Sequence, residues 1–151
     1  MELKDLRIVL TGATGGIGAA TAKRLIAAGA RLGVVARDQG KLDALVAEYD
    51  AEVFPILASV DDYGAIEEGV GAYCEAHGGM DVLVNNAGIL RDGPVTALGF
   101  GGFKKLPLEI WDEVLRVNLT GAFYCVRASL EHMIRSKSKG VIVNISSISR
   151  E

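Results

Sequence analysis

The sequence lacks the features that mark several large protein classes. Its two cysteines, Cys74 and Cys125, lie far apart and without CxxC spacing, so they indicate neither a disulfide framework nor a zinc site. No apolar run reaches the ~18 residues that cross a bilayer, and Met1–Asp5 has no apolar stretch typical of a signal peptide. We therefore expect a cytoplasmic protein without a membrane partner or a bound metal, in which both thiols are reduced and packed.

An excess of charge of one sign is also missing. The chain has 16 basic and 19 acidic residues, mixed along its length, and a net charge of -3. Such a balance provides no strong attraction to nucleic acid or to a membrane surface. Half of the 151 residues are hydrophobic, which is enough for one sizeable core. We see no internal repeat or boundary, so we expect one domain over residues 1–151 that binds a small molecule.

Short β-branched apolar runs alternate with segments that have helical spacing. The expected strands are 7–10, 32–36, 52–57, 81–84 and 141–145, and the expected helices are 17–28, 41–48, 62–77 and about 108–135. Alternation with short linkers requires right-handed crossovers between parallel strands. The pattern therefore predicts an α/β fold with a doubly wound parallel sheet of strand order 3-2-1-4-5.

One segment, Leu98–Lys105, breaks this rhythm. It is rich in glycine and phenylalanine and has no clear period. We expect a mobile loop, because glycine lets the backbone reorder. Two interpretations carry equal weight: a flap on the substrate side, or a surface insertion without a role.

A glycine-rich turn follows the first expected strand and opens the first expected helix. The N–H groups and the positive dipole end of a helix N-terminus can bind a pyrophosphate where no side chain blocks the backbone. We expect Gly12 to permit the tight turn, Gly16 the approach of phosphate, and Gly18 close packing of the helix. An ordinary strand-to-helix turn is the alternative, but the position in the first βαβ unit favours a dinucleotide site. The candidate contacts are Gly12, Thr14, Gly15, Gly16, Ile17 and Gly18.

The spacing of these glycines, Gly-x-x-x-Gly-x-Gly, resembles the cofactor motif of the short-chain dehydrogenases/reductases. Asn85–Gly88, after the fourth expected strand, is similar to their second signature. Further matches are Trp111-Asp112, Val117-Asn118-Leu119 and Asn144-Ile145-Ser146-Ser147, so the resemblance covers essentially the whole chain. It implies a Rossmann-type fold and an oxidoreductase with a nicotinamide cofactor. It also implies that Asn86, Ala87 and Gly88 pass beside the adenosine ribose.

The end of the second expected strand bears on the choice of cofactor. Ala36 occupies the position where NAD-type members of the family have an aspartate, and Arg37 follows it. An arginine can make a charge-assisted, bidentate contact with a 2′-phosphate, which favours NADPH/NADP over NADH/NAD. Asp38 argues the other way, because an NAD-type acid is expected ~20 residues past the glycine motif. Arg37 has the further alternative of being a solvated charge at a strand end.

The resemblance also places adenine beside the residue that follows the third expected strand. Family members usually have an Asp or Asn followed by Val there, whereas this chain has Ser59-Val60. A serine hydroxyl still forms hydrogen bonds, so this departure weakens one contact and retains the site.

For catalysis, the resemblance implies that Ser147 donates the substrate hydrogen bond. It also implies that the main chain of Asn118, at a helix bend, holds a water of the proton relay. The alternatives are that Ser146 or Ser147 caps a following helix and that Asn118 breaks its own helix. His77 and His132 are expected at solvated helix positions and receive no chemical role.

The family's proton donor is a tyrosine that follows this serine in a Tyr-x-x-x-Lys pattern, and the sequence ends at Glu151 before any such pattern. We therefore expect a piece of a longer polypeptide, inactive alone, that lacks the C-terminal strands and the tyrosine and lysine helix. Its partner is then the C-terminal remainder of the same enzyme. Without that remainder, the fifth strand is an open edge and the helix over 111–135 exposes apolar residues, which promotes association.

Ile89–Asp92, directly after the Asn-Ala-Gly signature, looks most like the 3-oxoacyl-acyl-carrier-protein reductases of fatty acid biosynthesis. This resemblance implies NADPH-dependent reduction of a 3-oxoacyl thioester by a homotetramer that associates through the helix starting near Trp111. The alternatives are a short-chain reductase of another carbonyl compound, such as a sugar or a steroid, and a non-catalytic dinucleotide-binding fragment.

Overall fold

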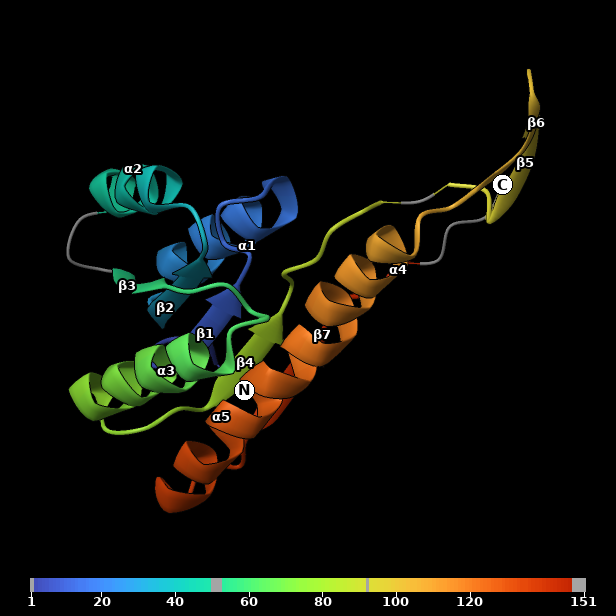
Figure 1. Ribbon diagram of the computed structural model, residues 1–151. Helices are drawn as coiled ribbons and strands as arrows, with labels where there is room; N and C mark the ends of the chain where they lie inside the picture. Colours follow the sequence, from blue (N-terminus) through green and yellow to red (C-terminus); the bar gives the residue numbers. More distant parts are fainter. Residues whose placement is uncertain (1, 50–52, 92, 148–151) are drawn as a thin grey trace.

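A parallel sheet forms the centre of the molecule (Figure 1). The computed structural model describes residues 2–49, 53–91 and 93–147. In sequence order the strands of this sheet are β1 (Arg7–Thr11), β2 (Arg31–Ala36), β3 (Val53–Leu57), β4 (Val82–Asn85) and β7 (Val141–Asn144). Their spatial order is β3-β2-β1-β4-β7, and every neighbouring pair is parallel. Since β7 is the fifth of these strands along the chain, the predicted order 3-2-1-4-5 and the α/β fold are confirmed.

Helices cover both faces of the sheet (Figure 1). Helices α1 (Gly16–Ala27) and α2 (Gln39–Tyr49) cover one face, and α3 (Tyr63–His77) and α5 (Gly121–Arg135) cover the other. Helix α4 (Leu108–Leu115) precedes α5 and extends beyond the sheet (Figure 1). Because successive side chains of a strand point to opposite faces, each strand contributes to two cores. Ile8 and Leu10 belong to the core with α1 and α2, whereas Val9 packs in the core with α3 and α5.

Gly33 in the middle of β2 explains how a large aromatic side chain fits in the second of these cores. Tyr73 of α3 is fully buried, and its ring lies against the backbone of β2. A Cβ atom on Gly33 would lie 2.8 Å from Tyr73 Cδ2, a distance that real Cβ atoms essentially never show. The Tyr73 hydroxyl donates a hydrogen bond to the carbonyl of Arg31 over 2.6 Å. The glycine thus lets α3 pack close to the sheet.

The helix predicted over about 108–135 is continuous but not uniformly α-helical. A π-helical turn, η2 (Arg116–Thr120), joins α4 to α5 without a break. A π turn adds one residue to a helical turn and is often found at functional sites. Gly121 follows it at a close contact with the segment after β3, because a Cβ atom there would lie 2.7 Å from Val60 Cγ2.

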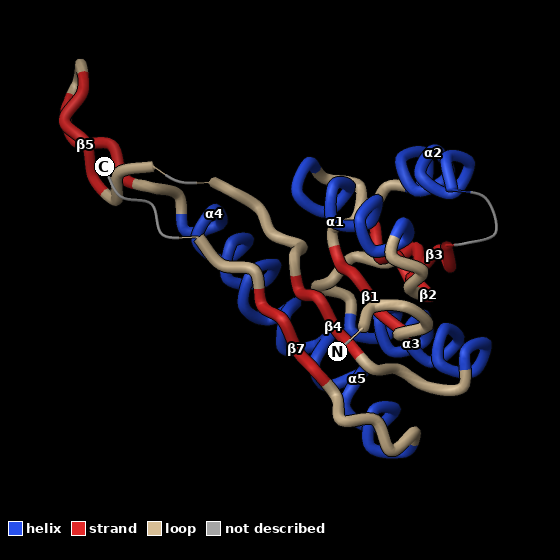
Figure 2. Tube along the Cα trace, turned by 180° about the vertical axis from the view of Figure 1, so that it is seen from behind, coloured by secondary structure: helices blue, strands red, loops and turns tan. Residues whose placement is uncertain are grey.

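The segment Leu98–Lys105, predicted as a loop, forms a β-hairpin, so that prediction was wrong. Strands β5 (Thr96–Gly99) and β6 (Gly102–Lys105) are antiparallel, and Leu98 lies opposite Phe103. Positive φ angles at Gly101 and Gly102 permit the tight turn between the strands. Figures 1 and 2 show the hairpin extending away from the parallel sheet. Its apolar side chains Leu98, Phe100 and Phe103 are exposed.

The predicted open edge and apolar helix face are both present. Within the described residues, β7 pairs with β4 alone and borders the sheet (Figure 2). Along α4 and α5, Trp111, Phe123 and Ile134 are 55%, 59% and 73% exposed. Such a surface favours association.

Both cysteines are free and buried, in agreement with packed thiols. Burial raises the pKa of Cys74 to about 11 and the pKa of Cys125 to about 12. The prediction of a solvated His77 was wrong, because this partly buried ring stacks on Tyr73 with 4.4 Å between ring centroids. His132 is partly buried as well. No helix in the described ranges is long and apolar enough to cross a membrane.

An ion pair between Arg7 and Asp81 closes the amino-terminal end of the sheet. Arg7 Nη2 and Nε donate to the two carboxylate oxygens over 2.6 and 2.9 Å, and both side chains are 19% exposed. The Arg7 side chain lowers the pKa of Asp81 to about 2 from the ordinary value of 3.8. The lower pKa in the folded protein means that this ionised carboxylate stabilises the fold above about pH 4 and loses that effect as the pH falls through about 2.

We expect Asp81→Asn to lower the free energy of unfolding at pH 7 by roughly 1 to 2 kcal/mol. Urea unfolding at pH 7 and at about pH 3 checks this. Below about pH 4 the unfolded parent chain takes up a proton at Asp81 that the folded chain does not, so the difference between the two proteins should shrink. Glu131→Gln is the control, since the Glu131–Arg135 pair is exposed and contributes little. A difference that is the same at both pH values would contradict the assignment.

Candidate cofactor-binding site

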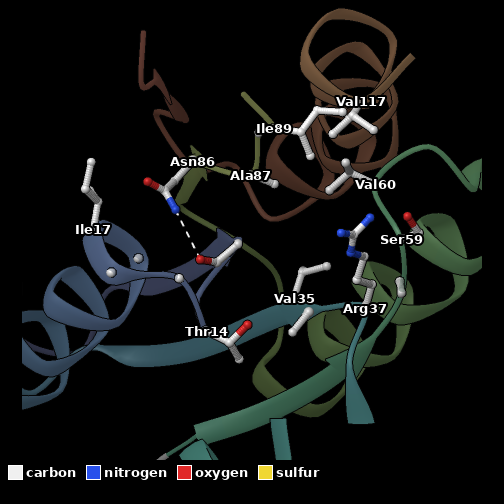
Figure 3. Close-up of a pocket in the computed structure, with 17 residues that line it drawn as sticks. Thr14, Ile17, Val35, Arg37, Ser59, Val60, Asn86, Ala87, Ile89 and Val117 are labelled. Atoms are coloured by element: carbon white, nitrogen blue, oxygen red, sulfur yellow. Dashed lines mark hydrogen bonds between the residues drawn. The ribbon is translucent and has the colours of Figure 1, made fainter. Parts of the chain in front are cut away.

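A cavity of about 490 Å³ lies beyond the carboxyl ends of β1, β2, β3 and β4 (Figure 3). In open α/β sheets, ligands bind at this edge, where the strand order reverses. Every cofactor contact predicted from the sequence lines the cavity: Gly12, Thr14, Gly15, Gly16, Ile17, Gly18, Arg37, Ser59, Val60, Asn86, Ala87 and Gly88. The structure thus brings together residues that are up to 76 positions apart along the chain.

The glycines of the first turn differ in what surrounds them. Gly12 has a φ of +66°, and a Cβ atom there would lie 2.8 Å from Ala87 Cα. A Cβ atom on Gly18 would lie 2.0 Å from the carbonyl oxygen of Gly12. Around Gly16, by contrast, no described atom comes within 4 Å of the Cβ position. Gly12 and Gly18 are therefore needed for the turn and its packing, whereas Gly16 leaves the space beside the cavity open.

The N-terminus of α1 presents unpaired donors at this open space. Gly15 is the N-cap residue, no described side chain caps the helix, and the first turn contains no acidic residue. The N–H groups of Gly16, Ile17 and Gly18 have no acceptor within the helix, as at any helix start. Together with the positive end of the helix dipole, they form a surface suited to phosphate oxygens.

Asn86 holds the turn after β4 against the turn after β1. Its side-chain Nδ2 donates to the carbonyl of Thr11 over 3.1 Å and to that of Gly12 over 3.2 Å. Figure 3 shows the second of these hydrogen bonds. Thr11 Oγ1 in turn accepts from the main-chain N–H groups of Asn86 and Ala87, both over 3.0 Å. Sequence reasoning placed Asn86 beside the cofactor but did not predict this connection between the turns.

Arg37 and Asp38, at the end of β2, have different environments. Figure 3 shows the Arg37 side chain extending from β2 toward Ser59 and Val60 on the cavity wall. No carboxylate of the described residues forms an ion pair with it. The Asp38 carboxylate accepts a hydrogen bond from the N–H of Lys41 over 2.9 Å at the start of α2, and Asp38 does not line the cavity.

Ser59, at the end of β3, donates its hydroxyl proton to the carboxylate of Asp61. Arg116 Nε donates to the other oxygen of that carboxylate over 2.8 Å. The hydrogen bond from Ser59, followed by that from Arg116, lowers the pKa of Asp61 below its ordinary value. Asp61 is therefore an ionised acceptor at neutral pH.

The two predicted catalytic residues lie outside the cavity lining. Asn118 lies in the π-helical turn, so it does not break its helix, and its side chain pairs with both main-chain groups of Ile89 over 2.8 and 2.9 Å. Ser147 is exposed beyond the end of β7. A helix that Ser146 or Ser147 would cap falls outside the described residues.

Sequence reasoning missed several apolar residues of the wall: Val35, Ala36, Ala58, Ile89 and Val117. All but Val117 adjoin predicted contacts along the chain, so extending each motif by one or two residues would have found them. Val117 comes from the π-helical turn, and only the fold places it opposite the strand ends.

Comparison with known proteins gives a consistent result. The model of the short-chain dehydrogenase family matches residues 7–151. The chain is 37% identical to the 3-oxoacyl-acyl-carrier-protein reductase of Thermotoga maritima and 35% identical to the L-rhamnose 1-dehydrogenase (NAD(P)(+)) of Azotobacter vinelandii, covering 98% and 99% of this chain. It spans 58% of each of these relatives.

A solved structure, the serine dehydrogenase from Escherichia coli, superposes with a TM-score of 0.80 at 29% identity, over 94% of this chain and 62% of that chain. The resemblance inferred from the sequence motifs is thereby confirmed. Because the family model matches nearly the whole length, this chain belongs to the short-chain dehydrogenase family.

Proposed function

We propose that this chain is the cofactor-binding part of an oxidoreductase that reduces a ketone with NADPH. The observation that carries the proposal is that the predicted cofactor contacts of the glycine turn, β2, β3 and β4 line one cavity. A 3-oxoacyl thioester is the proposed substrate, supported by the 37% identity with the Thermotoga maritima reductase. A non-catalytic dinucleotide-binding fragment is the second candidate, supported by the position of Ser147 and Asn118 outside the cavity lining.

The residues of the cavity fit a phosphorylated dinucleotide. When bound, NADPH would supply the hydride for reduction of the carbonyl. The start of α1 would hold the pyrophosphate, and Arg37 would contact the 2′-phosphate through a charge-assisted hydrogen bond. Asp38 is engaged by the start of α2, which supports NADPH over NADH.

For the chemistry, Ser147 would donate a hydrogen bond to the substrate carbonyl, and the main chain of Asn118 would hold a water of the proton relay. The tyrosine that protonates the alkoxide and its lysine would come from the C-terminal remainder. The exposed apolar face of α4 and α5 supports a homotetramer as the working form.

An NADPH-oxidation assay with an acetoacetyl thioester tests the function. We expect the chain of verified mass to bind NADPH without turnover, and turnover to appear when a C-terminal segment bearing Tyr-x-x-x-Lys is joined to it. Binding without turnover in the joined protein would select the non-catalytic candidate. Failure to bind either nicotinamide cofactor would contradict both candidates.

We predict that Arg37→Ala lowers the affinity for NADPH roughly 10- to 100-fold, the range of a hydrogen bond to a charged group, and changes the affinity for NADH by less than about twofold. Calorimetric titration with both cofactors measures this. Asp38→Asn is the matched control, because asparagine caps a helix as well as aspartate does. If Asp38 were an NAD-type acid, that control would weaken NADH binding.

Gly16→Ala and Gly18→Ala should separate cofactor binding from folding. At Gly16 the added methyl group has room in the protein, so we expect unchanged or slightly higher stability but at least about tenfold weaker NADPH binding, because the methyl group lies where the pyrophosphate approaches. At Gly18 the methyl group collides with the carbonyl of Gly12, and we expect a loss of more than about 2 kcal/mol. Urea unfolding and NADPH titration of both variants check the pair. Equal effects of the two substitutions on stability would refute the distinction.

A further inference from the structure

A chain of hydrogen bonds runs along the cavity wall at the end of β3. Its members are Ser59, which lines the cavity, Asp61 and Arg116. Ser59 donates to one oxygen of the Asp61 carboxylate, and Arg116 donates to the other. Asp61 is 21% exposed and does not line the cavity. Of the three residues, Ser59 alone lines the cavity.

The direction of these hydrogen bonds fixes what Ser59 can offer. A serine hydroxyl has one proton to donate and two lone pairs to accept, whereas an ionised carboxylate can only accept. The Asp61 carboxylate is ionised at neutral pH and accepts the hydrogen bond from Ser59, whose proton stays on the hydroxyl oxygen. The hydroxyl oxygen then presents only lone pairs to the cavity.

The geometry of the fold places the base of a dinucleotide at this position, if the proposed function holds. In such sheets the pyrophosphate lies at the first helix N-terminus and the adenosine ribose at the end of the second strand. The base attached to that ribose continues toward the next strand outward, which is β3. There, Val60 and Val117 provide apolar surface beside Ser59 (Figure 3). A planar base would thus be held by apolar contacts and present its polar edge to the Ser59 oxygen.

We propose that Asp61 is a positioning residue that holds the Ser59 hydroxyl as an acceptor, so that the site selects a base with an amino group at this edge. Adenine carries such a donor on its six-membered ring. Hypoxanthine has a carbonyl oxygen at the same position, and that oxygen would face the lone pairs of Ser59. This inference rests on the proposed function and adds the origin of its base selectivity.

Arg116 gives this arrangement its rigidity. It lies in the π-helical turn beside Val117, so the carboxylate that orients Ser59 is held from the opposite wall of the cavity. The Arg116 side chain is 58% exposed, and it can be solvated when Asp61 is removed. Removal of the carboxylate should therefore free the Ser59 hydroxyl to rotate without leaving a buried charge.

The test compares the binding of NADPH with that of its reduced hypoxanthine analogue by calorimetric titration of the full chain. We expect a preference for NADPH of roughly tenfold, the size of one hydrogen bond gained against one lost. In Asp61→Ala the hydroxyl can either donate or accept, so the preference should fall to within about twofold, mainly because the analogue binds more tightly. Ser59→Ala should lose the same preference because NADPH binds more weakly.

Glu131→Ala is the matched control, since it also removes a carboxylate paired with an arginine, on α5 and outside the cavity lining. It should keep the full preference. An Asp61→Ala protein that retains the preference would overturn the proposal. So would a Ser59→Ala protein that retains it, because Asp61 would then contact the base directly. If the parent chain binds NADPH and the hypoxanthine analogue equally well, the positioning role is overturned but the proposed function still stands. If it binds neither compound, both are overturned.

Discussion

The contact between the turns after β1 and β4 is the constraint on which the candidate site depends. These strands are neighbours, but the chain leaves them in different directions, toward α1 after β1 and toward the hairpin after β4. Asn86 joins the turns by donating two hydrogen bonds to Thr11, from its main-chain N–H to Oγ1 and from its side-chain Nδ2 to the carbonyl, and the absence of a side chain at Gly12 allows the backbones to touch. The two turns are in contact directly after their strands, and the chain segments that continue from them separate. The cavity lies between those segments, as expected where the strand order reverses.

This constraint also separates the functions of the glycines. At Gly12 and Gly18, other atoms of the protein fill the space that a side chain would need, so the fold requires glycine there even without a ligand. Gly16 faces open space, so a need for glycine there comes from the ligand. A glycine motif therefore combines a folding requirement with a binding requirement, and only the surroundings of each residue tell them apart.

The sequence alone predicted the strand order and the residues around the cavity, for one physical reason. In a parallel sheet, all carboxyl ends lie at one edge, so motifs that follow different strands must converge. The resemblance to the family assigned Ser59 and Asn86 to the cofactor site, and the convergence of the strand ends explains why they line one cavity with Thr14 and Arg37.

What the sequence did not predict depends on contacts between distant residues or on very short patterns. The hydrogen bond from Arg116 to Asp61 joins residues 55 positions apart, and nothing in the local sequence of either residue indicates it. The hairpin over Thr96–Lys105 was missed because each strand has only four residues, too few for a clear alternation beside several glycines.

The cavity and the predicted catalytic serine lie at different parts of the sheet. The lining residues run from Gly12 to Val117 along the chain and come from the end of β2, from the segments that follow β1 to β4, or from the π-helical turn. Ser147 follows β7, a strand at the border of the sheet that is exposed on much of its surface. The cavity wall is thus formed by a packed and hydrogen-bonded centre, whereas the surroundings of Ser147 belong to the border of the sheet. On the proposed function, binding of the cofactor would therefore depend on the centre of the sheet and the position of Ser147 on its border.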